Sequence, residues 1–254
     1  MNVSHMKSCL LVSDAVYKEA TECESILSSL ITSDYKFIDC NDSQCVVFKS
    51  HNNTIFIAFR GTEMSSLHDI QVDCMVTKRH TQDGGHVHSG FWYALNAVYD
   101  EIQTWMIEHS SLDDMILVTG HSLGGAIATL CGARLTHSDY RPVIYTFGAP
   151  RIGDHAFASR FDHIHLFRFV NNNDIVPRLP PTKFGYVHPG QMWYITYKGF
   201  VTCSSTPWTR FLDMIMGRVS GLLSGHLFDI FHDHSIAQYR KHLIQYKNHH
   251  DGTS

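Results

Sequence analysis

One serine stands in a context that would make it a nucleophile. Ser122 lies in the run Gly-His-Ser-Leu-Gly-Gly at 120–125, after an apolar stretch and before a run of small residues typical of a helix. Glycines on both sides allow a tight turn from strand to helix, which exposes the hydroxyl at the carboxyl end of a sheet. The first N–H groups of the helix would lie beneath it. Acyl transfer needs this arrangement, so the pattern predicts an activated serine.

A serine hydroxyl reacts when a base removes its proton, and the base needs an acid that orients it. The acid is expected on a loop directly after a later strand. Asp174 fits, because 164–170 has a strand pattern and three asparagines lead from it to the aspartate. Asp139, Asp154 and Asp162 lie in earlier helix or turn contexts. A turn-capping role is the alternative for Asp174.

The base must be chosen among many histidines, since the chain has 19. Those that follow Asp174 are His188, His226, His232, His234, His242, His249 and His250. His232 and His234 stand at a predicted break between two helices, where a ring can reach across the sheet edge. The residues alone do not separate these two. His249 and His250 belong to a polar tail, and His242 to a helical pattern with a solvated face.

Periodicity predicts the elements that would position these side chains. Helical spacing occurs at 6–31 and 90–109. Strands are predicted at 36–39, 44–49, 54–59, 116–119, 143–147 and 164–170. Near-continuous apolar strands separated by helices imply a mostly parallel central sheet with helices on both faces. With 254 residues and neither linker nor repeat, we expect one α/β domain over 1–254.

Several separate stretches resemble the class 3 lipases, the fungal-type α/β-hydrolases. They occur at 58–62, 87–91, 120–125, 146–154, 173–181, 184–190 and 233–234. The resemblance implies an α/β-hydrolase fold with a mostly parallel central sheet, helices on both faces and a short helical lid. It also implies that Ser122, Asp174 and His234 form the catalytic triad. His188 and His121 would then have structural and packing roles.

The oxyanion hole is expected to have two donors. Leu123 follows the nucleophile and would offer its N–H from the helix N-terminus. The second donor is expected in the loop after an early strand, at 59–62. By the resemblance, Thr62 supplies a backbone N–H and a stabilising hydroxyl.

The resemblance places a lid directly after the oxyanion loop. Met64, Leu67 and Ile70 recur there at helical spacing, and we assign them to the lid and to substrate contact. Relatives have a tryptophan within an acidic motif at the position of Ile70, so this chain departs from the family there. A surface helix with an inward apolar stripe is an equal alternative.

A second unusual stretch lies at 207–231. Its apolar residues share one helical face: Trp208, Phe211, Leu212, Ile215, Val219, Leu222, Leu223 and Phe228. Gly217, Gly221 and Gly225 recur on another face and would permit close helix approach. Core packing is the first interpretation, and a flap that shapes the acyl pocket is the alternative.

Composition limits the partners and the compartment. The chain is 44% hydrophobic and 17% charged, which indicates a folded globular protein, and its formal charge of −4 argues against a nucleic acid partner. No apolar run reaches membrane-spanning length, and no signal peptide pattern is seen. Seven cysteines without a Cys-x-x-Cys pair fit a reducing compartment. A cytoplasmic location is therefore expected, with non-classical secretion as the alternative.

Neither a metal nor a cofactor is expected, because the His-x-His pairs at 86–88 and 163–165 lack accompanying carboxylates. The residues and the resemblance together predict a serine carboxylic ester hydrolase acting on lipid esters. A triacylglycerol lipase is the leading assignment, and transient contact with a lipid–water interface would accompany it. The alternatives are a phospholipase A1, a soluble short-chain esterase and, from a different class, a non-catalytic lipid-binding module.

Overall fold

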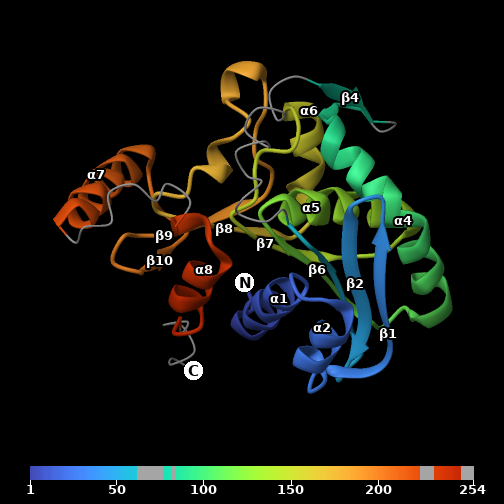
Figure 1. Cartoon of the computed structure of the whole chain (residues 1–254). Helices are drawn as coiled ribbons and strands as arrows, with labels where there is room; N and C mark the ends of the chain where they lie inside the picture. The colour runs from blue at the N-terminus through green and yellow to red at the C-terminus, as the bar shows by residue number, and fades with distance from the viewer. Residues whose placement is uncertain (62–76, 82–83, 224–231, 247–254) are drawn as a thin grey trace, which may run out of the picture.

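An eight-stranded sheet runs through the centre of the molecule (Figure 1). The computed structural model describes residues 1–61, 77–81, 84–223 and 232–246. In spatial order the strands are β1 (Ile31–Cys40), β2 (Ser43–Ser50), β3 (Thr54–Phe59), β6 (Met115–His121), β7 (Val143–Phe147), β8 (Leu166–Asn171), β9 (Gln191–Ile195) and β10 (Val201–Thr202). Neighbours from β3 to β9 pair in parallel, whereas β1, β2 and β10 are joined antiparallel. The predicted mostly parallel central sheet is confirmed.

Helices cover both faces of this sheet. One face carries α4 (Ser89–His109) and α5 (Leu123–Leu135), and the other carries α1 (Val3–Ala15), α2 (Ala20–Leu27) and α8 (Ile236–Leu243). The remaining elements are β4 (Lys78–His80), β5 (His86–His88), α6 (His155–Ala158), α7 (Pro207–Leu223), η2 (Thr136–Ser138), η3 (Ser159–His163), η4 (Val176–Arg178), η5 (Thr182–Phe184) and η6 (His232–His234). Within the described ranges no helix is long and apolar enough to cross a bilayer.

Alternation along the strands divides the apolar side chains between two buried clusters. In β3, Ile55, Ile57 and Phe59 join the cluster under α4 and α5. Phe56 and Ala58 join the cluster under α1, α2 and α8. A strand buried on both faces therefore reads as continuously apolar, which is the pattern that the sequence shows.

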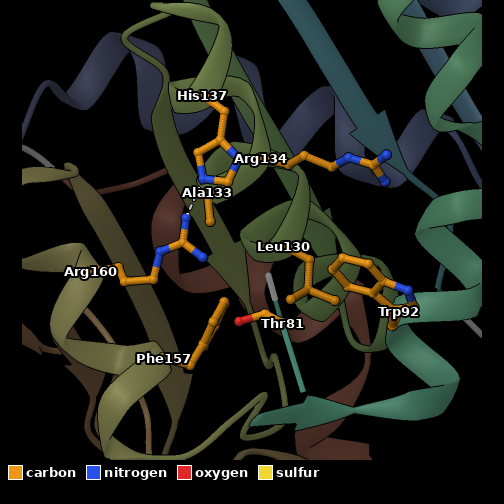
Figure 2. A pocket seen from close by; sticks show the side chains of 8 residues that line it. All are labelled: Thr81, Trp92, Leu130, Ala133, Arg134, His137, Phe157 and Arg160. Atoms are coloured by element: carbon orange, nitrogen blue, oxygen red, sulfur yellow. Dashed lines mark hydrogen bonds between the residues drawn. The ribbon is translucent and has the colours of Figure 1, made fainter. Parts of the chain in front are cut away.

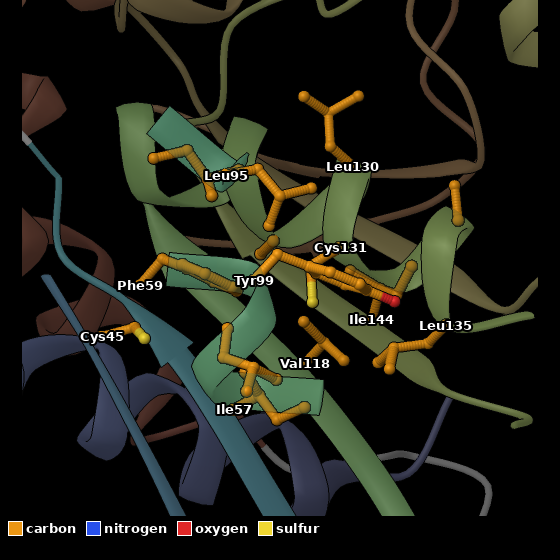
Figure 3. Close-up of a cluster of buried hydrophobic side chains, with 14 of the residues drawn as sticks. Cys45, Ile57, Phe59, Leu95, Tyr99, Val118, Leu130, Cys131, Leu135 and Ile144 are labelled. Carbon is orange, nitrogen blue, oxygen red and sulfur yellow. The ribbon is translucent and has the colours of Figure 1, made fainter. Parts of the chain in front are cut away.

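The helix that follows Ser122 is buried around nearly its whole circumference. In α5 the described side chains are all buried except those of Leu123 and Arg134, which are partly exposed. Figure 3 shows Leu130, Cys131 and Leu135 of this helix within the apolar cluster. Each fully buried aliphatic side chain contributes about 1.5–3 kcal/mol. This packing fixes the helix behind the predicted nucleophile.

The helical spacing predicted over 6–31 belongs to two helices. The first, α1, ends at Ala15, where the N–H of Lys18 bonds the Ala15 carbonyl in a closing turn. The second, α2, spans Ala20–Leu27, and β1 begins at Ile31. Periodicity alone does not register this break, because both helices turn apolar residues toward the same cluster.

The core-packing interpretation of 207–231 is wrong for its first part. In α7 the side chains of Trp208, Phe211, Leu212 and Ile215 are 42–66% exposed. The helix presents this face outward because its opposite face is bonded to the edge of the sheet. The side chains from 218 to 231 lie outside the described residues, so the flap interpretation stays a prediction.

Candidate active site

Ser122 joins β6 to α5 in a rare backbone conformation, with φ 58° and ψ −130°. Its N–H donates to the carbonyl of Phe147 on β7 at 2.9 Å, and its carbonyl accepts from the N–H of Gly125 at 3.0 Å. A Cβ on Gly124 would lie 2.1 Å from the carbonyl oxygen of Phe59, so glycine lets α5 approach β3 this closely. The predicted strand, tight turn and helix are all present.

Asp174 is fully buried beyond the end of β8. Its Oδ1 accepts the N–H of Val176 at 2.9 Å, and its Oδ2 accepts the hydroxyl of Tyr239 at 2.5 Å. The N–H of Asp174 donates to the carbonyl of Asn171 at 3.2 Å, which turns the chain out of the strand. A buried carboxylate needs such donors, since burial otherwise disfavours its charge.

The other aspartates considered lie elsewhere. Asp154 caps α6 by accepting the N–H of Phe157 at 3.0 Å, and it also lies 2.9 Å from Nδ1 of His86. Asp139 follows η2 in a left-handed conformation, and Asp162 lies within η3. Their positions leave Asp174 as the aspartate beside the predicted base.

His234 makes the contact expected of a base with its acid. Its Nδ1 lies 2.9 Å from each carboxylate oxygen of Asp174, and both side chains are fully buried. An ionised carboxylate only accepts hydrogen bonds, so Nδ1 carries the proton and Nε2 keeps a lone pair. Asp174 thus selects the tautomer that a general base requires. The side chain of His232, the competing candidate, lies outside the described residues.

The reacting ends of Ser122 and His234 are both buried. Neither Ser122 Oγ nor His234 Nε2 has a hydrogen-bond partner among the described residues. Leaving a buried polar atom without a hydrogen bond costs about 1–3 kcal/mol of stability. Hydrogen bonds between catalytic groups often shorten only when substrate binds. Both residues lie at the end of β7, because the Ser122 N–H donates to the carbonyl of Phe147 and a Cβ on Gly148 would lie 3.0 Å from His234 Cε1. Gly148 itself directly follows Phe147, which bonds Ser122.

His121 holds the backbone of His234. Its Nε2–H donates to the carbonyl of His234 at 2.6 Å, so its Nδ1 accepts the hydroxyl of Tyr17 at 2.8 Å. The two histidine rings have centroids 4.6 Å apart. Burial and the adjacent His234 lower the pKa of His121 well below 6.5, so this ring stays neutral. His121 is therefore more than the packing residue that we expected.

Sequence reasoning missed Tyr239 and Tyr17. Tyr239 lies on α8, and its hydroxyl both donates to Asp174 and accepts the N–H of Asn171 at 3.0 Å. Burial and the Asp174 charge raise its pKa well above 10, so the hydroxyl keeps its proton. No spacing rule marks either tyrosine. The inward face of the helix after the predicted base was the available signal for Tyr239.

A sequence model described as Lipase (class 3) matches residues 56–184, about half of the chain. The matched segment contains both Ser122 and Asp174. The chain belongs to the class 3 lipase family. The resemblance noted from separate motifs is confirmed.

Named relatives of this class 3 lipase chain are fungal enzymes. The lipase of Rhizomucor miehei is 33% identical over 193 residues, covering 72% of this chain and 52% of that protein. The secreted mono- and diacylglycerol lipase A of Penicillium cyclopium is 29% identical over 202 residues, covering 77% and 66%. A solved triacylglycerol lipase with a serine protease triad as its catalytic centre superposes with a TM-score of 0.63 at 28% identity, covering 76% and 79%. This chain spans about half the length of the Rhizomucor relative.

The predicted oxyanion hole is described in part. Leu123 is the first residue of α5, so its N–H has no acceptor within the helix. A Cβ on Gly61 would lie 3.2 Å from Ser122 Cβ, which places the loop after β3 beside the nucleophile. Thr62 and the predicted lid residues Met64, Leu67 and Ile70 lie outside the described residues.

His188 contacts the loop that follows the acid. Its Nε2–H donates to the carbonyl of Pro177 at 2.6 Å. Burial and the nearby Arg168 guanidinium lower the pKa of His188 well below 6.5. This neutral ring holds the loop at Pro177 through one hydrogen bond and does not bond Asp174.

A small cavity of about 80 Å³ lies away from these side chains (Figure 2). Its lining residues are Thr81, Trp92, Leu130, Ala133, Arg134, His137, Phe157 and Arg160. The guanidinium of Arg134 lies 3.8 Å from the ring centre of Tyr99, and that of Arg160 lies over Phe157. None of the predicted site residues lines this cavity, and its two arginines are stacked on aromatic rings.

Proposed function

We propose that this chain is a serine carboxylic ester hydrolase acting on lipid esters, with triacylglycerols as the leading substrate class. One observation carries the proposal. His234 Nδ1 is held between both oxygens of buried Asp174, while His234 Nε2 and Ser122 Oγ have no partner among the described residues. A base with a fixed tautomer and an unbonded serine hydroxyl, both at the end of β7, are suited to acyl transfer.

In the acylation step, Ser122 Oγ attacks the ester carbonyl carbon while His234 Nε2 accepts its proton. Asp174 stabilises the imidazolium and does not itself become protonated. The carbonyl oxygen becomes an oxyanion, for which the Leu123 N–H and Thr62 are the proposed donors. The intermediate collapses as the carbon–oxygen bond to the alcohol breaks, and His234 returns the proton to the leaving alcohol.

In the deacylation step, water attacks the acyl-enzyme. His234 accepts a proton from the water, a second oxyanion forms, and the bond to Ser122 Oγ breaks as the proton returns to it. The products are a carboxylic acid and free enzyme. The protein needs a rigid base and two oxyanion donors for both halves.

Relatives support a glyceride substrate, since one is named a mono- and diacylglycerol lipase and another a triacylglycerol lipase. A panel of tri-, di- and monoacylglycerols, phosphatidylcholine and short-chain esters would rank these substrates. Turnover of acylglycerols above phospholipids and soluble esters is expected. Preference for phosphatidylcholine would instead favour a phospholipase A1, and preference for soluble esters a short-chain esterase.

The nucleophile assignment is tested by Ser122→Ala. We expect p-nitrophenyl ester hydrolysis to fall by roughly four to six orders of magnitude and fluorophosphonate labelling to disappear. Ser138→Ala is the matched control, because Ser138 is exposed at the end of η2 and should leave both readouts unchanged. Retained turnover in Ser122→Ala, with a native circular dichroism spectrum, would refute the assignment.

We also propose a reducing, cytoplasmic location. The six cysteines within the described residues are free thiols, and four of them are buried. The Penicillium relative is named a secreted enzyme, so the two proteins would differ in compartment. Maleimide labelling of the protein denatured directly from its cells should modify all seven cysteines, and protected thiols would contradict the proposal.

A further inference from the structure

Helix α7 presents a continuous apolar surface to solvent. The α7 face consists of Trp208, Phe211, Leu212, Ile215 and Met216, which follow helical spacing and are 42–66% exposed. Single exposed apolar residues are ordinary, whereas a contiguous group on one helical face indicates an interaction surface. Figure 1 shows α7 at the outer edge of the molecule, beside β9 and β10.

The opposite side of α7 is fixed to the rim of the candidate active site. Asp213 Oδ2 accepts the hydroxyl of Tyr194 at 2.9 Å and the N–H of Tyr197 at 3.1 Å. A Cβ on Gly217 would lie 2.4 Å from Nδ2 of Asn172, in the loop that leads to Asp174. The helix therefore cannot turn its apolar face inward without losing these partly buried hydrogen bonds.

Charge around α7 differs from that of the whole chain. Arg210 lies on α7, Arg178 and Lys198 lie beside it, and the carboxylates are Asp213, bonded inward, and Asp233, which lines a hollow with Gly217. Arg178 contacts Met214 on α7 at 3.1 Å, and Lys198 is exposed next to Tyr197. The full chain carries −4, so three cationic side chains at α7, with Asp213 bonded inward, make this region less acidic than the chain as a whole.

We propose that the α7 face docks this protein on the surface of a lipid bilayer that contains anionic phospholipids. An apolar helical face that includes tryptophan and phenylalanine, with basic residues beside it, is typical of helices that lie in the headgroup layer. Basic side chains near such a face are attracted to anionic lipid. The inference rests on the proposed function, because docking through α7 would bring the rim around Asp174 to the ester substrate.

The test measures binding without hydrolysis. In the Ser122→Ala background, the protein is sedimented with vesicles of phosphatidylcholine alone or mixed with phosphatidylglycerol. Trp208→Ser/Phe211→Ser should weaken binding to the mixed vesicles by about tenfold or more, which corresponds to about 1.4 kcal/mol. Ile107→Ser/Leu112→Ser is the matched control, since these side chains are 72% and 105% exposed outside α7, and it should bind like the parent.

Further readouts separate the outcomes. Binding of the parent should fall with added salt and be weaker on pure phosphatidylcholine. Its tryptophan emission should shift to the blue on vesicles, and this shift should be lost in Trp208→Phe, which preserves the fold. No binding by the parent, equal loss in both double variants, or an α7-dependent dimer without vesicles would overturn the proposal. Bound but hydrolytically inactive protein with Ser122 intact would instead refute the proposed function alone.

Discussion

Asp174 is held by more groups than His234. Oδ2 accepts the hydroxyl of Tyr239, and Oδ1 accepts the N–H of Val176, while both oxygens face His234 Nδ1. On the other side of the base, His121 holds the His234 carbonyl. Orientation of the imidazole therefore depends on side chains from several helices and loops, and each of them limits its freedom.

Removing the hydroxyl of Tyr239 should lower activity while the packing of its ring is kept. Tyr239→Phe loses a hydrogen bond to a buried charge, which is typically worth about 1.5–3 kcal/mol. We expect kcat to fall roughly tenfold to a hundredfold with little change in KM for a soluble ester. Tyr145→Phe is the control, because its hydroxyl bonds only the carbonyl of Asn2 at 3.3 Å. A kcat unchanged in Tyr239→Phe would contradict the positioning role.

At the level of single residues, sequence was informative where chemistry imposes a local pattern. Ser122 was predictable from its flanking glycines, and Asp174 from its place after a strand. His234 and His232 could not be told apart without the resemblance, because both stand at the same predicted break between two helices. Tyr17 was beyond prediction, since its partner His121 lies in a distant segment and only tertiary structure brings them together.

Among the elements, α5 lies in close backbone contact with the sheet. A Cβ at Gly124 would lie 2.1 Å from the carbonyl oxygen of Phe59 on β3. Neither backbone can move away without displacing the turn at Ser122. Farther along the same helix, a Cβ at Gly132 would meet the end of the Ile144 side chain at 2.2 Å. A side-chain terminus can change rotamer, whereas a carbonyl in a sheet cannot.

This difference predicts unequal effects of the same substitution within one helix. Gly124→Ala should lower the free energy of unfolding by roughly 1–3 kcal/mol more than Gly132→Ala. In Gly132→Ala, the higher helix propensity of alanine offsets up to about 1 kcal/mol of the cost. Gly124→Ala should also lose esterase activity, because it displaces the turn at Ser122. Urea unfolding and initial rates measure both effects. Equal stabilities of the two variants would contradict the close approach.

Element prediction was accurate where apolar periodicity reports burial. The strand patterns at 54–59 and 143–147 coincide with β3 and β7, and 90–109 nearly coincides with α4. The α7 segment misled for a physical reason. An amphipathic stripe shows that one face is apolar but does not say whether protein, another molecule or solvent lies against it.

For the whole molecule, buried neutral histidines connect stability to acidity. His121 is buried and His188 half-buried, and desolvation together with the neighbouring His234 and Arg168, respectively, lowers their pKa values well below 6.5 in the folded protein. The unfolded chain binds protons at these positions when the native protein does not. Their contribution to stability is therefore present above about pH 6.5 and is lost as the pH falls below it.

Replacing one of them should flatten this dependence. His188→Gln keeps an amide donor for the Pro177 carbonyl but removes the titrating group. Between about pH 6.5 and 5, the slope of unfolding free energy against pH should decrease by up to roughly 1.4 kcal/mol per pH unit. Urea titrations at several pH values measure it. Identical slopes for parent and variant would show that His188 is not protonated on unfolding.

We also propose that residues 1–254 act as one domain, since one buried cluster draws on both the first and the last described helices. Limited proteolysis should then not yield separately folded fragments that contain α1 and α8. Stable separate fragments would contradict this.

The hydrogen bonds from Tyr17 through His121 to His234 have a consequence for how the protein is made. Ser122 and Asp174 leave the ribosome well before His234, which lies 60 residues beyond the aspartate. A nascent polypeptide therefore cannot hydrolyse esters until its late segment emerges and closes against the earliest helix. With the proposed triad, competence for catalysis depends on this late docking of the segment around His234.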